Sequence, residues 1–491
     1  MDALAVFFYS MPFLMTLGSA FVIAAFGGAV LARPIVPLII YLAVFFIYPT
    51  SSYGSLQTSG PSVYFRGSGQ LFFPALLWGL LVTVIWIWLG RAFWRTQSQV
   101  AKHVPAIMAW FFGWFILLLM HGVVGLFLGQ DLTAIFGMHG FVNLPWMGVL
   151  VLLLYWSGTS ETVLLVAGRL LVFAALTKSI FGLTRYALFG GDSSNVYQNL
   201  MGVNVKLTFF DIGDGLVCLL GCVVSVSLLV IRRENIKSRL WDITYFITII
   251  LSLTCVTLSF RRTAWVGMVL VSVFLLSKMQ PKMRWSIATI GLPILAIGVT
   301  YAAVKRIGQT RGASGFSAFF YDLASKPAGP ESHRLLELRL AWDAFSSSPL
   351  LGIGSWGRYA SANLIPWQDP ASAGSFLHSG VLHVAMKAGL PGMVLLGGVI
   401  VSFVIFVRHM PRDLPAMGQA VVLAGCSGLL FMLPDMLLGT PIPQLRTTQL
   451  LALCLGLPYF AAAALSKPIK SLTNAPTSVA WHRPVVVSKP L

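Results

Sequence analysis

The stretch TLSFRRTAWVGMVL, from Thr257 to Leu270, places two adjacent arginines between two long apolar runs. Long apolar runs are typical of helices that cross a membrane, where a charged side chain costs at least about 2.5–3.5 kcal/mol. Arg261 and Arg262 mark the tight turn at which one such run ends and the next begins. They therefore need a role that offsets this cost.

The composition of the whole chain is that of a membrane protein. Of its 491 residues, 57% are hydrophobic and 10% are charged, and the mean hydropathy is +0.83. Soluble domains carry roughly 25% charged residues. The start MDALAVFFYSMPF lacks the basic segment of a cleavable signal peptide, so the first apolar run is expected to be a true span. We therefore predict an all-α integral membrane protein.

Runs of roughly twenty apolar residues predict where the chain crosses the bilayer, and they give a total of about 12–14 transmembrane helices. The predicted spans are 5–31, 34–49, 71–90, 105–128, 145–157, 161–181, 213–231, 241–260, 263–277, 285–304, 377–407, 414–438 and 447–465.

Short basic loops predict the orientation of these spans. The loops 91–103, 232–239, 278–284 and 408–413 all fall on one side, which the positive-inside rule makes cytoplasmic. Residues 466–491 fall on the same side and are rich in Pro, Ser and Thr, so a disordered cytoplasmic tail is expected there. Residues 1–465 then form one polytopic membrane domain.

The opposite side receives four longer connections, at 50–70, 129–144, 182–212 and 305–376. The last of these, residues 305–376, is large enough to build structure outside the membrane. It contains the sequence ESHRLLELRLAWDAFSSS, in which Leu335, Leu338, Trp342 and Phe345 recur at helical spacing. We therefore predict one large external loop that contains a helix.

Basic residues gather on this external side as well, although the positive-inside rule does not account for them there. Arg261 and Arg262 can be explained as side chains that reach external lipid phosphates, or as part of a site for an anionic substrate. The net charge of +18 is divided between two membrane faces, so no nucleic-acid partner is expected. The external loop adds further cations: Lys305, Arg306, Arg311, Lys326, Arg334, Arg339 and Arg358.

The sequence FLHSGVLHVAMKAGLPGMVLL, at the entry of the span 377–407, resembles the hallmark of the O-antigen ligase and polymerase superfamily. That hallmark is His, then Asn, Ser or Gln, nine residues, Gly, two residues, and Gly, Thr or Tyr. Here it is formed by His378, Ser379, Gly389 and Gly392.

Two further segments resemble the same family, and the resemblance covers about residues 240–440. RRTAWVG is similar to its Arg-Gly-Ala-Trp-Leu-Gly segment, which aligns Arg262 with the family arginine, while Val266 replaces a leucine. HRLLELRLAWDAFSSSPLLGIGSWGRY is similar to its external helix, with Arg334 as the matching arginine and Arg339 as a near alternative.

The resemblance implies a glycosyltransferase, with a fold like that of the glycosyltransferase-C class, at the periplasmic face of the bacterial inner membrane. The donor would be a glycan on undecaprenyl diphosphate, and the acceptor a lipid A core sugar or a lipid-linked glycan, with membrane lipids around the protein. Motifs do not separate a ligase, a polymerase, including one for exopolysaccharide, and a protein O-glycosyltransferase.

The chemistry of these residue types predicts their roles in such a site. Arginine makes paired hydrogen bonds to phosphate oxygens, so Arg262 and Arg334 are expected to neutralise the departing diphosphate. Arg261, Arg339 and Ser379 are assigned to substrate binding. A neutral histidine can remove the acceptor proton, so His378 is the predicted general base, with hydrogen bonding to phosphate as its competing role.

No carboxylate motif predicts a metal site. Asp322, Asp369 and Asp435 are scattered, each interpreted as a helix cap or an ion-pair partner, and no external Asp-x-Asp occurs. We therefore predict transfer that needs neither metal nor cofactor and inverts the anomeric carbon. The alternative from another class is a transporter of a glycan or other anion, for which Arg169 and Lys178 would line the path.

Overall fold

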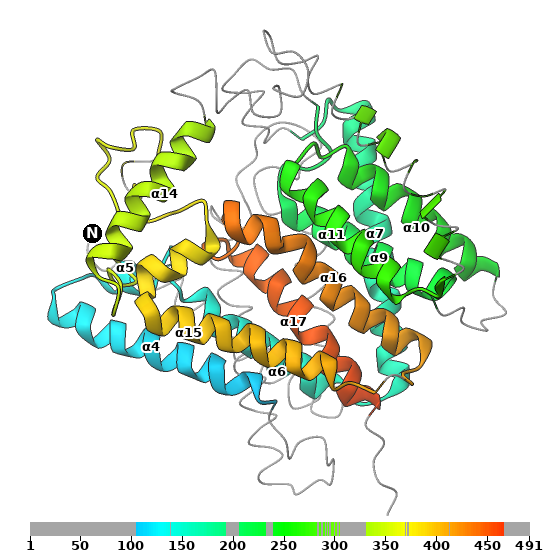
Figure 1. The fold of residues 1–491 in the computed structure, drawn as a ribbon, viewed down its shortest axis with the longest axis horizontal. Helices are drawn as coiled ribbons and strands as arrows, with labels where there is room; N and C mark the ends of the chain where they lie inside the picture. Colours follow the sequence, from blue (N-terminus) through cyan, green and yellow to red (C-terminus); the bar gives the residue numbers. More distant parts are fainter. Residues whose placement is uncertain are drawn as a thin grey trace, which may run out of the picture.

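The computed structural model describes residues 105–192, 206–231, 239–281 and 330–465, apart from Met138, Asp369, Ala371, Ser372 and Arg412, and scattered positions from 284 to 304. Every regular element in this part of the chain is a helix (Figure 1). They are α4 (Ile107–Phe127), α5 (Leu132–Ile135), α6 (Asn143–Ser157), α7 (Glu161–Leu188), α9 (Ile212–Val226) continued by the π-helix η3 (Ser227–Ile231), α10 (Arg239–Thr257), α11 (Arg262–Lys278), α14 (Pro330–Ser347), α15 (Gly380–Arg408), α16 (Ala416–Leu438) and α17 (Leu445–Leu465).

Seven helices of this part are long and apolar enough to cross a membrane: α4, α7, α9 with its π-helical continuation, α10, α15, α16 and α17. The apolar helix α6 has 15 residues and α11 has 17, so both are shorter. The prediction of an all-α, multi-pass membrane protein is confirmed. The predicted spans 5–31, 34–49 and 71–90, most of 285–304, and the tail 466–491 lie outside the described residues, so the total of about 12–14 stays a prediction.

One predicted boundary is wrong, because α7 continues to Leu188 beyond the predicted end at residue 181. The charges of Lys178 and Arg185 lower the hydropathy of this segment. Both are buried in ion pairs, Lys178 with Asp214 at 2.8 Å and Arg185 with Asp192 at 2.7 Å. Ion pairs with Asp214 on α9 and with Asp192 just after α7 therefore let the helix continue where the hydropathy falls.

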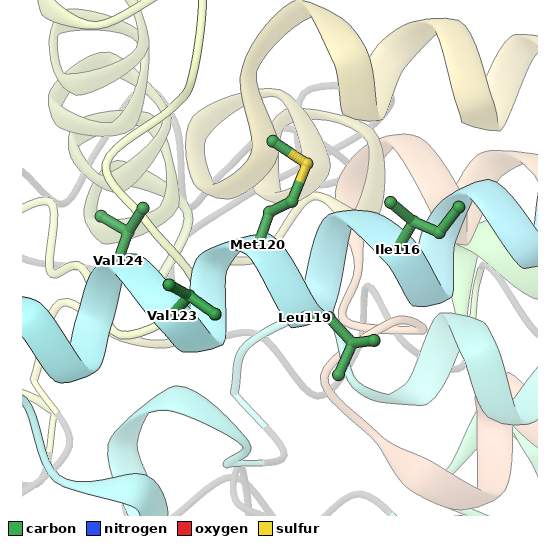
Figure 2. Close-up of a pocket in the computed structure, with 5 residues that line it drawn as sticks. All are labelled: Ile116, Leu119, Met120, Val123 and Val124. Atoms are coloured by element: carbon green, nitrogen blue, oxygen red, sulfur yellow. The ribbon is translucent and has the colours of Figure 1, made fainter.

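The helices pack around α9 and α17, the two most enclosed spans. Helix α17 packs against α6 and α16, while α9 packs against α7, α10 and α16. Helices α4 and α15 form a pair on one flank (Figure 1). On the outer face of α4, five apolar side chains line a shallow pocket (Figure 2), a surface suited to lipid: Ile116, Leu119, Met120, Val123 and Val124.

Successive spans alternate in direction, so the connections predicted to be external meet at one end of the bundle. Two hydrogen bonds join these connections: the Asn143 side chain donates to the Ile442 carbonyl at 2.8 Å, and the Thr208 amide donates to the Leu258 carbonyl at 3.2 Å. We call this end, where α9, α11, α15 and α17 begin and α10 and α16 end, the motif end.

The helix predicted within residues 305–376 is confirmed as α14, and its location outside the membrane stays a prediction. The predicted apolar stripe of this helix is only partly buried. Leu335 and Trp342 are 53% and 57% exposed, whereas Glu337 and Ala341 are fully buried. A pattern of apolar residues cannot identify this face, because its central buried residue is a carboxylate. After α14, Gly352 takes a left-handed conformation with φ of +70°, which ends the helical segment with a tight turn.

The segment after α14 is held against a kink in α15. At Gly389, φ is +62° and ψ is −157°, a conformation that is essentially restricted to glycine. There the Leu390 amide donates to the Pro349 carbonyl at 2.9 Å, and the Ile353 amide donates to the Met386 carbonyl at 2.8 Å. This junction fixes α14 relative to the start of α15.

Replacing Gly389 with alanine should destabilise the protein. The new Cβ would lie 2.7 Å from the Gly352 nitrogen and 2.8 Å from the Leu350 oxygen, in addition to backbone strain of about 1–3 kcal/mol. The measurement is thermal unfolding of the purified protein in one detergent. The matched control is Gly397→Ala on the same helix, where the added Cβ meets open space. Equal melting temperatures for the two variants would contradict the packing described here.

Candidate functional site

The turn between α10 and α11 presents the arginine pair at the motif end. Phe260 takes a left-handed conformation, with φ of +53°, and is buried. Trp265, one turn into α11, donates from its indole nitrogen to the Thr257 carbonyl at 3.2 Å, which closes the turn. Arg262 is the first residue of α11 and Arg261 precedes it. The tryptophan of the RRTAWVG segment therefore orients the turn that carries both arginines.

Arg261 is anchored to two neighbouring elements. Its guanidinium donates to the Phe210 carbonyl and lies over the Phe210 ring. Its Nη2 lies 3.6 Å from Asp435 Oδ1 at the end of α16, and the side chain remains 28% exposed. Arg262 is half-buried and also interacts with the protein. The interpretation of Asp435 as an ion-pair partner is thus confirmed.

Asp435 shows that the predicted site residues lie together. Its carboxylate attracts the charges of Arg261 and Arg334 and that of His378 when protonated, and it is repelled by Asp211. These groups come from α14 and from the segments that precede α9, α11 and α15. Residues separated by more than a hundred positions therefore lie within electrostatic range of one buried carboxylate.

His378 is the half-buried histidine of this cluster. Its Nδ1 lies 2.7 Å from Glu337 Oε2, and the side chain is 26% exposed. The Phe376 ring packs edge-on against the imidazole at 5.0 Å. Within the described part of the chain, Nε2 has no hydrogen-bond partner. The protein thus holds one nitrogen of the ring, while no described residue holds the other.

Glu337 is the partner of His378 that sequence reasoning missed. It is fully buried in α14, and its Oε1 accepts hydrogen bonds from Trp367 and Gln368, each at 2.9 Å. Burial favours a higher pKa, but the hydrogen bond and charge of His378 and the two further donors hold the pKa of Glu337 below its usual range. The only signal in the sequence is its position one turn after Arg334.

The other predicted site residues take different positions. Ser379 is buried and caps α15, because its hydroxyl accepts from the Leu382 amide at 3.3 Å. Arg334 is half-buried on α14, whereas Arg339 on the same helix is exposed. The charge of Arg334 stabilises the Asp435 carboxylate, whereas Arg339 has no such effect. This effect and its greater burial favour Arg334 over Arg339 as the arginine that belongs to the cluster.

A second buried charge cluster supports the motif end from inside the bundle. Arg446 donates to Asp214 at 2.6 Å and lies 3.7 Å from Asp211, while Lys178 pairs with the same Asp214. Arg169 lies over the Trp241 ring at 4.4 Å. The two residues considered for a transport path therefore have contacts within the bundle, and these contacts give them structural roles.

The electrostatics of the motif end favour an anion. A helix N-terminus carries a partial positive charge, so acidic residues are favourable in a first turn and basic residues are not. Asp211 caps α9 and Asp214 occupies its first turn. Helix α11 has no acidic residue in its first turn and instead begins with Arg261 and Arg262. Positive charge at a helix N-terminus favours a nearby anion, and Asp435 offsets part of this charge through its ion pair with Arg261.

No group of three or more His, Cys, Asp or Glu side chains among the described residues is placed to hold a metal. Asp322 and Asp369 lie outside the described residues. Transfer without a metal therefore stays a prediction.

Comparison with known protein families identifies one match. Residues 247–397 match the family model described as O-antigen ligase. None of the curated proteins matches the chain. The matched range includes the arginine pair, α14 with Glu337, and the segment with His378, and it ends before Asp435.

Proposed function

The chain belongs to the O-antigen ligase and polymerase superfamily of glycan-transferring membrane enzymes, and from this premise we propose its reaction. The protein transfers a glycan from an undecaprenyl-diphosphate donor to an acceptor hydroxyl at the periplasmic face of the bacterial inner membrane. The observation that supports the proposal is Nε2 of His378, which has no partner among the described residues and lies at the motif end in a cluster with Arg261 and Arg334.

The arginines fit the donor. A polyprenyl diphosphate keeps its phosphates at the membrane surface and its chain in the lipid, so its site needs cations at the end of a helical bundle. Arg262 and Arg334 neutralise the charge that develops on the diphosphate as it departs, and Arg261 contributes to binding. Interactions that strengthen as charge develops lower the barrier of the chemical step.

The histidine fits the acceptor. An alcohol is a poor nucleophile while it is protonated, so a base that takes its proton during attack accelerates transfer. The acceptor oxygen forms a bond to the anomeric carbon while the bond from that carbon to the diphosphate oxygen breaks. The electron pair leaves with the diphosphate and the proton moves to Nε2 of His378. A single displacement of this kind inverts the anomeric configuration.

Purified protein with a lipid-linked donor and a hydroxyl acceptor should form a glycosidic bond of inverted configuration with an excess of chelator present. The arginines supply the positive charge that a divalent ion supplies in other transferases. The anomeric configuration of the product is read by NMR, and rates are compared with and without chelator. A retained configuration would contradict direct displacement. Loss of transfer on adding chelator, with recovery on adding a divalent metal, would contradict the role given to the arginines.

The acceptor class is decided in the host. Deleting the gene of a ligase leaves polymer of normal length on the carrier and none on lipid A core. Deleting the gene of a polymerase leaves single repeat units. Analysis of surface and carrier-linked glycans distinguishes these outcomes from a protein acceptor, for which glycoprotein alone is lost.

A further inference from the structure

We propose that Glu337 is a positioning residue: its carboxylate accepts the Nδ1 proton of His378 and so leaves Nε2 unprotonated and directed at the acceptor. This inference rests on the proposed function, because it concerns the base in that reaction. The 2.7 Å contact joins a fully buried carboxylate to a partly exposed imidazole across 41 positions of sequence.

The two oxygens of Glu337 make different contacts. Oε1 accepts hydrogen bonds from Trp367 and Gln368, which belong to the segment between α14 and α15. Gln368 in turn contacts the Tyr359 hydroxyl at 2.9 Å and accepts from the Gly374 amide at 3.0 Å. Oε2 faces only His378 among the described residues. One oxygen thus anchors a loop and the other holds the base.

An ionised carboxylate fixes the tautomer of a histidine because it only accepts hydrogen bonds. A neutral His378 must then carry its proton on Nδ1, and Nε2 presents a lone pair. After Nε2 takes the acceptor proton, the negative charge of Glu337 stabilises the imidazolium. Among the described residues, His333 on α14 also interacts electrostatically with Glu337. Asp435 from α16 acts on His378 and is in turn affected by Arg261, Arg334 and Asp211.

If Glu337 only anchored the loop, its substitution would have a different effect. The substitution Glu337→Gln distinguishes this structural role from the positioning role. In Glu337→Gln the amide oxygen can still accept from Trp367 and Gln368. The amide NH₂ group then replaces Oε2 and donates to Nδ1, so His378 must carry its proton on Nε2. The hydrogen bonds from Trp367 and Gln368 are therefore kept, while Nε2 of His378 can no longer accept a proton. Trp367→Phe is the matched control, because it removes one donor to Oε1 and leaves the contact with His378 in place.

The experiment compares the full-length variants Glu337→Gln, Glu337→Asp and Trp367→Phe with His378→Ala, using a lipid-linked donor. We measure donor binding, melting temperature and the pH dependence of transfer. Glu337→Gln should bind donor normally and lose at least about 10²-fold in transfer. Its remaining activity should extend to lower pH, because the charge that stabilises the imidazolium is gone. Glu337→Asp should recover part of the rate, and Trp367→Phe should stay within a few-fold of the wild type.

Several results would overturn the inference. Wild-type transfer by Glu337→Gln, with His378→Ala inactive, removes the positioning role and leaves the proposed base intact. Equal losses in Glu337→Gln and Trp367→Phe with an unchanged pH profile assign Glu337 to the loop anchor alone. If Glu337→Gln does not fold, a Glu337→Asp variant that folds but has no activity also overturns the inference. Wild-type transfer by His378→Ala would instead contradict the proposed function itself.

Discussion

Replacing His378 with alanine should reduce glycan transfer by about 10²–10⁴-fold while leaving donor binding nearly unchanged. The reason is that, in the proposed reaction, proton removal contributes only as the acceptor attacks, whereas the arginines hold the donor diphosphate. The variant should fold, because the side chain is partly exposed and Glu337 keeps its contacts with Trp367 and Gln368. Single-turnover transfer and equilibrium binding of a lipid-linked donor, measured on the same preparation, separate the two effects.

His409→Ala is the matched control for this prediction. His409 is an exposed histidine at the other end of α15, where its ring contacts the Ile405 carbonyl at 2.8 Å. It should transfer glycan at the wild-type rate. If His378→Ala instead lost donor binding and transfer in equal proportion, His378 would be a ligand of the phosphate, which is its competing role.

Local sequence patterns predicted the helices, because helix formation depends on residues that are close together in the sequence. Each predicted span in the described part of the chain coincides with a helix, because a continuous apolar run must form its backbone hydrogen bonds internally in lipid. The arginine pair was found because charge in an apolar chain is costly and therefore visible, whereas His378 was found because it begins the family motif. Gly389 belongs to a motif whose physical reason emerges only from the close approach of residues 349–353.

Residues whose role depends on distant partners were not predicted. Glu337 gave no signal, because its burial is offset by His378, Trp367 and Gln368, which are 30 to 41 positions away. The exposure of Leu335 and Trp342 has the same origin, because α14 buries the Glu337 side chain and therefore turns these two residues outward.

Removing Arg334 should weaken both donor binding and transfer, with a loss of about 10²-fold or more in transfer. Arg334 is half-buried and its charge acts on Asp435. In the proposed reaction its guanidinium contacts the diphosphate in the bound state and in the transition state alike. Arg334→Lys should recover little, because an ammonium group cannot reproduce paired hydrogen bonds to phosphate oxygens. Donor binding and single-turnover transfer again provide the measurement.

Arg339→Ala provides the control for Arg334→Ala, since both substitutions remove one arginine from the same helix. Arg339 is exposed and lies five positions further along α14. It therefore contributes the same charge as Arg334 to this region of the protein but from a different position. If the overall positive charge of the external loop attracted the donor, the two variants would lose activity equally, and added salt would reduce the difference from wild type. If Arg334 holds the diphosphate directly, only Arg334→Ala loses transfer at saturating donor, because a group that stabilises developing charge is missed even when the donor is bound. A larger loss in Arg339→Ala would instead move the donor site to the exposed face of α14.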